Sequence, residues 1–175
     1  MLIDSFLEYL RLERNYSERT IVSYETDLRE FEEYFQEVDA GLDFKKIDAD
    51  IVRRWMVHLM DEGRAATSVN RKLSTLRSFY RFLLRRKEVV INPMLKVVGP
   101  KKKKPLPFFV REKDMDRLLD ESLFEEGFEG CRDRLILEMF YATGMRLSEL
   151  IGLNDADVDL SARLIKVTGK RNKQR

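Results

Sequence analysis

Arg146 and Lys170 are the residues of this 175-residue chain whose types and spacing most directly suggest chemistry. Arg146 follows the glycine that ends an apolar run, in FYATGMRLSELIGL, and Lys170 comes 24 residues later in GKRNKQR. A guanidinium can hold two oxygens of a phosphodiester and stabilise charge at phosphorus. A lysine on a turn can protonate a departing sugar oxygen. An arginine where a loop meets a helix is more often solvated or a cap, so this hypothesis needs support from elsewhere.

A second set of polar residues follows one side of a helix expected from Thr67 to Arg86. Its apolar face is formed at steps of three and four by Val69, Leu73, Leu76, Tyr80 and Leu83. About 100° away lies a polar and basic stripe. Such groups contact phosphates and base edges when a helix enters a major groove of DNA. The alternative interpretation is a surface helix whose arginine side chains lie over the core. The predicted DNA contacts on this helix are Asn70, Arg71, Ser74, Arg77 and Arg81.

The distribution of charge supports a polyanionic partner. Residues 1–63 carry 8 basic and 16 acidic residues, a net charge of −8. Residues 64–111 carry 14 basic residues and one acidic residue, a net of +13, and residues 112–175 carry 11 and 14, a net of −3. Since a solvated surface helix normally mixes both signs, the basic band indicates nucleic-acid binding.

Two further groups are candidate phosphate contacts. Ser17, Arg19 and Thr20 open a predicted helix, where free N–H groups favour an anion, although ordinary helix capping is the safer interpretation of these residues. Lys101, Lys102, Lys103 and Lys104 lie in GPKKKKPLP, which proline and like-charge repulsion keep from forming a packed helix. This run either clamps phosphates or simply keeps a linker solvated.

Composition excludes several classes of protein. With 43% hydrophobic and 37% charged residues, and no apolar run near the ~20 needed to span a bilayer, we expect a globular cytoplasmic protein without membrane contact. One cysteine, Cys131, cannot form an internal disulfide, and we expect it to be buried. One Cys and one His (His58) cannot build a ligand cluster, so we expect no metal and no other cofactor.

The elements that must position these residues fall into two parts. We expect a four-helix bundle over 1–98, a basic Pro/Lys linker over 99–107, and a second domain over 108–175. The second domain should contain an amphipathic helix, a buried helix over CRDRLILEMFYATG, a short helix after Arg146 and an antiparallel hairpin or meander of strands. The fold class is therefore mainly α with a small α+β part. The roughly 70 residues of the second domain can bury only a small hydrophobic core, so we expect this domain to be incomplete.

These motifs carry a family resemblance. The chain resembles the tyrosine site-specific recombinases of the phage integrase class, and among these it resembles the Xer type most. The resemblance rests on ATGMRLSELIGL with its downstream lysine, and on the helix SVNRKLSTLRSFYRFLLR followed by NP and a basic linker. The resemblance covers the whole chain. It implies a SAM-like core-binding bundle and the start of a catalytic domain that together clamp double-stranded DNA at a recombination site, with homo- or hetero-tetramers in the intact parent.

The resemblance also implies roles for single residues. Arg146 matches the first catalytic arginine on the scissile phosphate, Lys170 the hairpin lysine that protonates the 5′-oxygen, and Glu149 an acidic residue that orients the arginine. The parent activity would be strand exchange through a 3′-phosphotyrosyl link.

The chain departs from the family pattern after the lysine. The family's His-x-x-Arg motif, later His or Trp and nucleophilic tyrosine are not found there, and all six tyrosines precede Arg146. We therefore expect these 175 residues to bind DNA without cleaving it, and Lys170 to sit on a frayed hairpin whose partner strand is lacking. The alternatives are a non-catalytic module that occupies recombination sites and a helical protein-interaction domain.

Overall fold

The computed structural model describes residues 1–102, 106, 108–120, 123–169 and 173–175. The chain forms two compact units, Met1–Pro105 and Leu106–Arg175, and each is described by itself. Lys103, Lys104, Lys170 and part of the predicted linker 99–107 lie outside the described residues.

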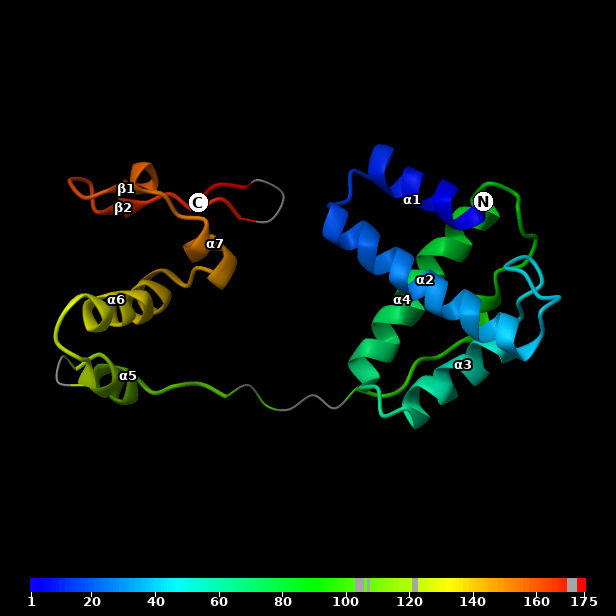
Figure 1. Cartoon of the computed structure of the whole chain (residues 1–175), viewed down its shortest axis with the longest axis horizontal. Coiled ribbons are helices and arrows are strands. Elements are labelled where there is room, and N and C mark those ends of the chain that lie inside the picture. The colour runs from blue at the N-terminus through cyan, green and yellow to red at the C-terminus, as the bar shows by residue number, and fades with distance from the viewer. Residues whose placement is uncertain (103–105, 107, 121–122, 170–172) are drawn as a thin grey trace. The chain divides into compact units, whose positions relative to one another are not determined.

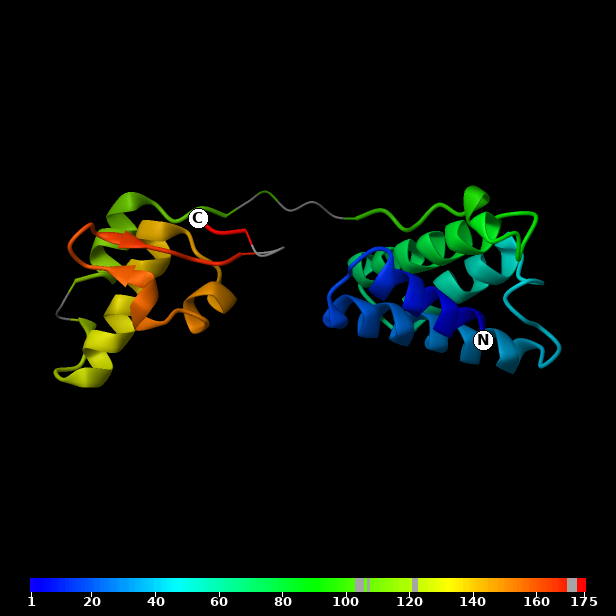
Figure 2. The same cartoon turned by 90° about the horizontal axis from the view of Figure 1, so that it is seen from above.

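Unit 1 contains the four predicted helices (Figure 1), which confirms the helical bundle. Their bounds are α1 Leu2–Leu12, α2 Glu18–Val38, α3 Ala49–Asp61 and α4 Ala66–Arg85. The second helix packs against the other three, and α3 also packs on α4. Figure 2 shows the same helices from above. Within the described part of the chain, no helix combines the length and apolar character needed to cross a membrane.

The core of unit 1 follows from the periodicity of its helices. The apolar face predicted for α4 is wholly buried, and Trp55 of α3 packs against Phe31 of α2 with 4.8 Å between ring centroids. The helix α3 begins where Asp48 accepts hydrogen bonds from the amides of Asp50 and Ile51, both at 2.9 Å. It is followed by Gly63 at φ +80°, a left-handed conformation that glycine adopts without strain.

The segment after α4 stays on unit 1. It contains a short 3₁₀ helix, η1 (Pro93–Lys96), which contacts α3 and α4. Val89, Met94 and Val97 of this segment are buried, so apolar packing holds it against the bundle.

Unit 2 consists of short elements around one longer helix. Their bounds are α5 Glu112–Leu118, α6 Phe128–Thr143, α7 Leu147–Ile151, η3 Asp155–Asp157, β1 Val158–Asp159 and β2 Leu164–Ile165. The two strands are antiparallel, with Val158 opposite Ile165 and Asp159 opposite Leu164. The predicted helices and hairpin are confirmed.

The predicted burial of α6 and Cys131 is wrong. Gly130 is the one buried residue of this helix, and Cys131 is exposed. The physical reason is that, within the described residues of unit 2, the other helices have five and seven residues and the strands two. These cannot cover an apolar helix on all sides.

Candidate nucleic-acid interface

The polar stripe of α4 lies at the surface beside the buried apolar face, but its members have different surroundings. Ser74 and Arg81 are exposed, whereas Asn70 and Arg77 are only partly accessible. Arg81 has no polar partner among the residues that the structure describes. The stripe is therefore not one uniform row of free donors.

Asn70 and Arg77 bind the backbone of the segment that leaves the bundle. Asn70 Nδ2 donates to the Pro100 carbonyl at 2.9 Å, and Arg77 Nη2 donates to the Val97 carbonyl at 3.1 Å. A Cβ at Gly99 would lie 2.2 Å from Asn70 Oδ1, so only glycine lets the chain pass this closely. Long-range contacts of this kind leave no signal in helical periodicity.

Arg71 joins α4 to α2 through a buried carboxylate. Asp27 is fully buried and accepts hydrogen bonds from Arg71 Nη1 at 2.6 Å and from Nη2 at 2.8 Å. Lys72 Nζ and Thr75 Oγ1 also donate to Asp27, at 3.2 and 2.7 Å. Asp27 was not among the predicted site residues, and the one signal in the sequence is its place between Tyr24 and Phe31 at helical spacing, on the apolar face of α2.

Two basic hollows lie along α4. One, of about 340 Å³, is lined by Arg19, Thr20, Ser23, Tyr24, Arg71, Ser74 and Thr75. The structure thus brings Arg19 and Thr20 together with Arg71 and Ser74 in one hollow. Ser17, the N-cap of α2, lies within hydrogen-bond distance of Thr20, 2.9 Å between hydroxyl oxygens.

The second hollow contains arginines that the sequence analysis missed. It has a volume of about 270 Å³, and Arg14, Arg81 and Arg85 line it with Tyr9 and Tyr16. Arg85 Nη1 donates to the Tyr9 hydroxyl at 2.9 Å. Arg14 lies in an acidic segment and Arg85 at a helix end, so the sequence pointed to this site only through Arg81 of the polar stripe and the net charge of residues 64–111. Together with the first hollow, it makes a basic surface from Arg71 to Arg85.

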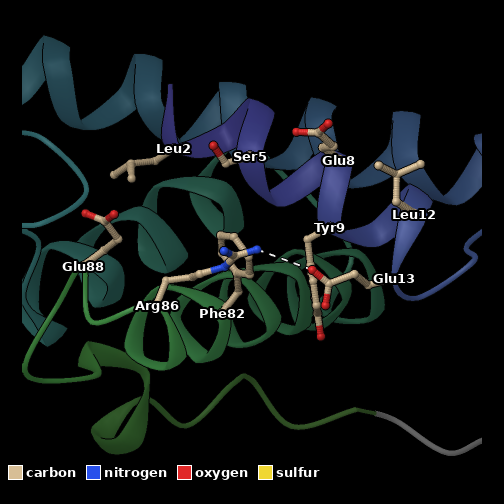
Figure 3. A pocket seen from close by; sticks show the side chains of 9 residues that line it. All are labelled: Leu2, Ser5, Glu8, Tyr9, Leu12, Glu13, Phe82, Arg86 and Glu88. Atoms are coloured by element: carbon tan, nitrogen blue, oxygen red, sulfur yellow. Dashed lines mark hydrogen bonds and ion pairs between the residues drawn. The ribbon is translucent and has the colours of Figure 1, made fainter.

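A third hollow, shown in Figure 3, has the opposite character. It has a volume of about 340 Å³ and lies between α1 and the end of α4. Glu8, Glu13 and Glu88 line it, and Arg86 forms an ion pair with Glu13 at 3.4 Å. Its carboxylates make it a poor surface for a polyanion.

The lysine run is described only in part. Lys101 and Lys102 are exposed directly after the bound Pro100, and Lys103 and Lys104 lie outside the described residues.

In unit 2, Arg146 is held at the surface by Glu149. Gly144 ends α6 in a left-handed conformation, Met145 is buried, and Arg146 is the N-cap of α7. Glu149 Oε2 accepts from the Arg146 amide and Oε1 from Nη1, both at 2.8 Å. The Arg146 side chain is 65% exposed while that of Glu149 is 4% exposed. A buried carboxylate thus fixes a guanidinium that solvent and anions can reach.

The charge state of Glu149 is set by the same contacts. The hydrogen bond from the Arg146 amide is the main cause that lowers its pKa from 4.5, with further contributions from the Arg146 and Arg175 guanidinium groups. Arg175 Nη2 donates to Glu149 Oε2 at 2.8 Å. Glu149 is therefore a carboxylate at neutral pH and can orient Arg146.

The segments before and after Lys170 are paired, whereas we expected a frayed hairpin. Val167 and Arg175 exchange backbone hydrogen bonds of 2.9 and 3.1 Å, and the Gly169 amide donates to the Lys173 carbonyl at 2.7 Å. Residues 173–175 thus pair with residues 167–169 through an isolated β-bridge between Thr168 and Gln174, although we expected no pairing segment there. A Cβ on Gly169 would lie 2.9 Å from Glu149 Oε1, so this hairpin reaches the Arg146–Glu149 pair. Lys170 itself is outside the described residues.

Comparison with known proteins identifies the family. A model described as "Phage integrase, N-terminal SAM-like domain" matches residues 3–87, and "Phage integrase family" matches residues 109–175. The chain belongs to the phage integrase family. The predicted resemblance and the SAM-like bundle followed by part of a catalytic domain are thereby confirmed.

Curated relatives of this phage integrase family member are bacterial. "Tyrosine recombinase XerC" of Staphylococcus carnosus is 40% identical over 172 residues, which cover 98% of this chain and 57% of the relative. The protein of the same name from Halalkalibacterium halodurans is 43% identical over 173 residues, 99% of this chain and 56% of that one. The chain spans just over half the length of these relatives.

Solved structures share the fold. A lambda integrase dimer bound to a COC' core site has a TM-score of 0.70 at 17% identity, over 99% of this chain and 59% of that one. The Tn1549 transposon integrase in complex with circular intermediate DNA has a TM-score of 0.73 at 16% identity, over 99% and 57%.

Proposed function

We propose that this chain binds duplex DNA through the basic surface of unit 1, with Lys101–Lys104 as additional phosphate contacts. The observation that carries the proposal is the pair of basic hollows along α4, which gathers five arginines on one side of the helix. Both DNA-bound structures described above have this fold, which supports the same use here. The partner would be a recombination site in the cytoplasm.

Within this surface, we assign direct base contacts to Ser74 and Arg81. Asn70 donates its amide N–H groups to the Ala66 and Pro100 carbonyls and would have to release one before it could donate to a base, while Arg77 binds the Val97 carbonyl through one of its five N–H groups. Arg81 is exposed and needs no such exchange, and the exposed Ser74, whose hydroxyl donates to the Asn70 carbonyl at 2.8 Å, can still accept a hydrogen bond from a base.

In unit 2, we propose that Arg146 binds the scissile phosphate, with Glu149 orienting it and Lys170 protonating the 5′-oxygen. An exposed guanidinium fixed by a buried carboxylate can form a bidentate contact with two phosphate oxygens. The parent reaction would be cleavage and rejoining through a 3′-phosphotyrosyl link, in a tetramer of identical or different recombinase subunits.

We further propose that the 175 residues bind DNA without cleaving it. Tyr141 is the described tyrosine nearest to Arg146 in sequence, and it precedes Arg146 on α6. Tyr80 is buried and donates a hydrogen bond to the Phe44 carbonyl at 3.0 Å, and burial raises its pKa. No tyrosine follows Arg146 in these residues.

Titration with duplex DNA at several salt concentrations tests binding. If the interface neutralises about six phosphates, log K should fall against log salt with a slope of about −5. A flat dependence, or no binding at low salt, would favour a protein-interaction domain instead. Neutralising Lys101–Lys104 should weaken preferred and random DNA about equally, whereas Arg81→Ala should weaken the preferred site more, because only base contacts carry sequence information.

A suicide DNA substrate tests cleavage. With a substrate that the full-length S. carnosus relative attacks, we expect no covalent adduct from the 175-residue chain. An adduct would refute the non-cleaving assignment, and its loss in Tyr141→Phe would identify the nucleophile.

A further inference from the structure

Asp27 has more polar contacts than stabilisation of a helix bundle requires. Each of its oxygens accepts two hydrogen bonds, Oδ1 from Arg71 and Lys72, and Oδ2 from Arg71 and Thr75. A carboxylate with four donors and no exposure cannot rotate. Since replacing a buried ion pair by apolar residues is often neutral or stabilising, stability alone does not explain such a network.

The contacts of Arg71 leave one edge of its guanidinium free. Arg71 has five N–H donors. Two of them bind Asp27, and the second hydrogen of Nη1 goes to Ser23 Oγ at 2.8 Å. The remaining two are Nε–H and the second hydrogen of Nη2, and neither has an acceptor among the described residues.

These two hydrogens lie on the same side of the guanidinium and are nearly parallel. That edge matches two oxygens of a phosphate, which a guanidinium binds bidentately. The Arg71 side chain is 51% exposed and lines the first basic hollow with Arg19 and Thr20, so an anion can reach it.

The charges of the network leave the hollow positive. Asp27 is shared by Arg71 and Lys72, and Lys72 also pairs with Glu30. Two acids therefore balance two bases, while Arg19 adds a positive charge with no polar partner within the described part of the chain.

We infer that Asp27 is a positioning residue for DNA binding, which holds Arg71 so that its Nε–Nη2 edge meets one backbone phosphate. The inference rests on the proposed DNA binding and adds a role for a buried acidic residue that would not touch DNA.

The substitution Asp27→Asn separates this role from two others. It removes a negative charge near the interface, so electrostatics alone would tighten DNA binding. A purely structural role would lower the stability of the bundle and leave binding by the folded protein unchanged. The positioning role instead weakens binding, by about tenfold at low salt, as expected for one charged hydrogen-bonded contact. It also makes the salt slope shallower by about 0.9, the value for one phosphate.

Two further variants complete the experiment. Arg71→Ala should weaken binding as Asp27→Asn does, and the double variant should bind no more weakly than Arg71→Ala, because both changes remove the same contact. Glu30→Gln is the matched control, since it removes the same charge from the same network without touching Arg71, and should not weaken binding. Folding of each variant is checked by circular dichroism, and binding is measured below its unfolding temperature.

The outcomes are distinct. If folded Asp27→Asn binds as well as or better than the unmodified chain, or if its effect adds to that of Arg71→Ala, the inference is wrong. If Asp27→Asn does not fold, Arg71→Lys decides, because lysine cannot present the bidentate edge. Arg71→Lys should then bind as weakly as Arg71→Ala, and binding equal to the unmodified chain would overturn the inference. Failure of the unmodified chain to bind DNA would refute the proposed function itself.

Discussion

The two units of this chain reach stability by different means. In unit 1, helices of 11 to 21 residues enclose a core of large, fully buried side chains. In unit 2, Met145 and Val167 are the buried hydrophobic residues among those described, and polar contacts around Glu149 join α7 to the final hairpin. Both units hold an arginine with a buried carboxylate, Asp27 for Arg71 and Glu149 for Arg146, but only in unit 1 does that carboxylate lie on helices fixed by a large core.

The largest expected difference between the units comes from one substitution made in each. Leu76→Ala in α4 removes a fully buried side chain and should cost about 2–5 kcal/mol of unfolding free energy. Leu135→Ala in α6 changes a side chain that is 56% exposed and should shift stability by no more than about 0.5 kcal/mol. Denaturant unfolding of both variants measures the two values. Equal losses would show that α6 is buried in solution and would remove the contrast.

A smaller effect should separate the two N-caps in unit 1. Asp48→Ala removes a side chain that accepts two backbone hydrogen bonds at the start of α3, and should cost about 1 kcal/mol. Ser17→Ala is the control, because the Ser17 side chain makes no such bond to α2 and should change stability less. Thermal unfolding of the two variants provides the test, and equal shifts would argue against the cap geometry at Asp48.

The smallest expected effect is the acid sensitivity of α7. Because the pKa of Glu149 is lowered from 4.5, its contribution is fully present above pH 4.5 and is lost as the pH falls through the lowered value. Acid below pH 4.5 should therefore loosen the contact between Glu149 and Arg146, and Glu149→Gln should remove this pH dependence. Chemical shifts of the Arg146 amide, followed by NMR between pH 6 and about pH 3, report it. A titration curve unchanged by Glu149→Gln would exclude Glu149 as the cause.

The same contrast between the units explains which features of the fold could be predicted from the sequence. The five apolar positions of α4 repeat at helical spacing, and all five are buried as predicted. The burial predicted for α6 failed, because an apolar pattern shows what a helix could bury but not whether partners exist to cover it.

The candidate sites show the same limit. Arg146 and Glu149 are three residues apart, so their contact follows from helix geometry. Asn70 binds Pro100, which lies 30 positions away in the sequence, and Arg71 binds Asp27, which lies 44 positions away. No local pattern encodes such distant pairs, and a charged residue such as Asp27 is normally expected at the surface.

The position of Glu149 has a consequence for how unit 2 opens. Its carboxylate accepts hydrogen bonds from Arg146 at the start of α7 and from Arg175 in the final hairpin, 26 residues further along the chain. Neither element can separate from the other without leaving a buried charge with fewer partners. The helix start and the hairpin should therefore unfold together as one cooperative segment. Hydrogen exchange would then show a common opening rate for the amides of Arg146, Val167 and Arg175.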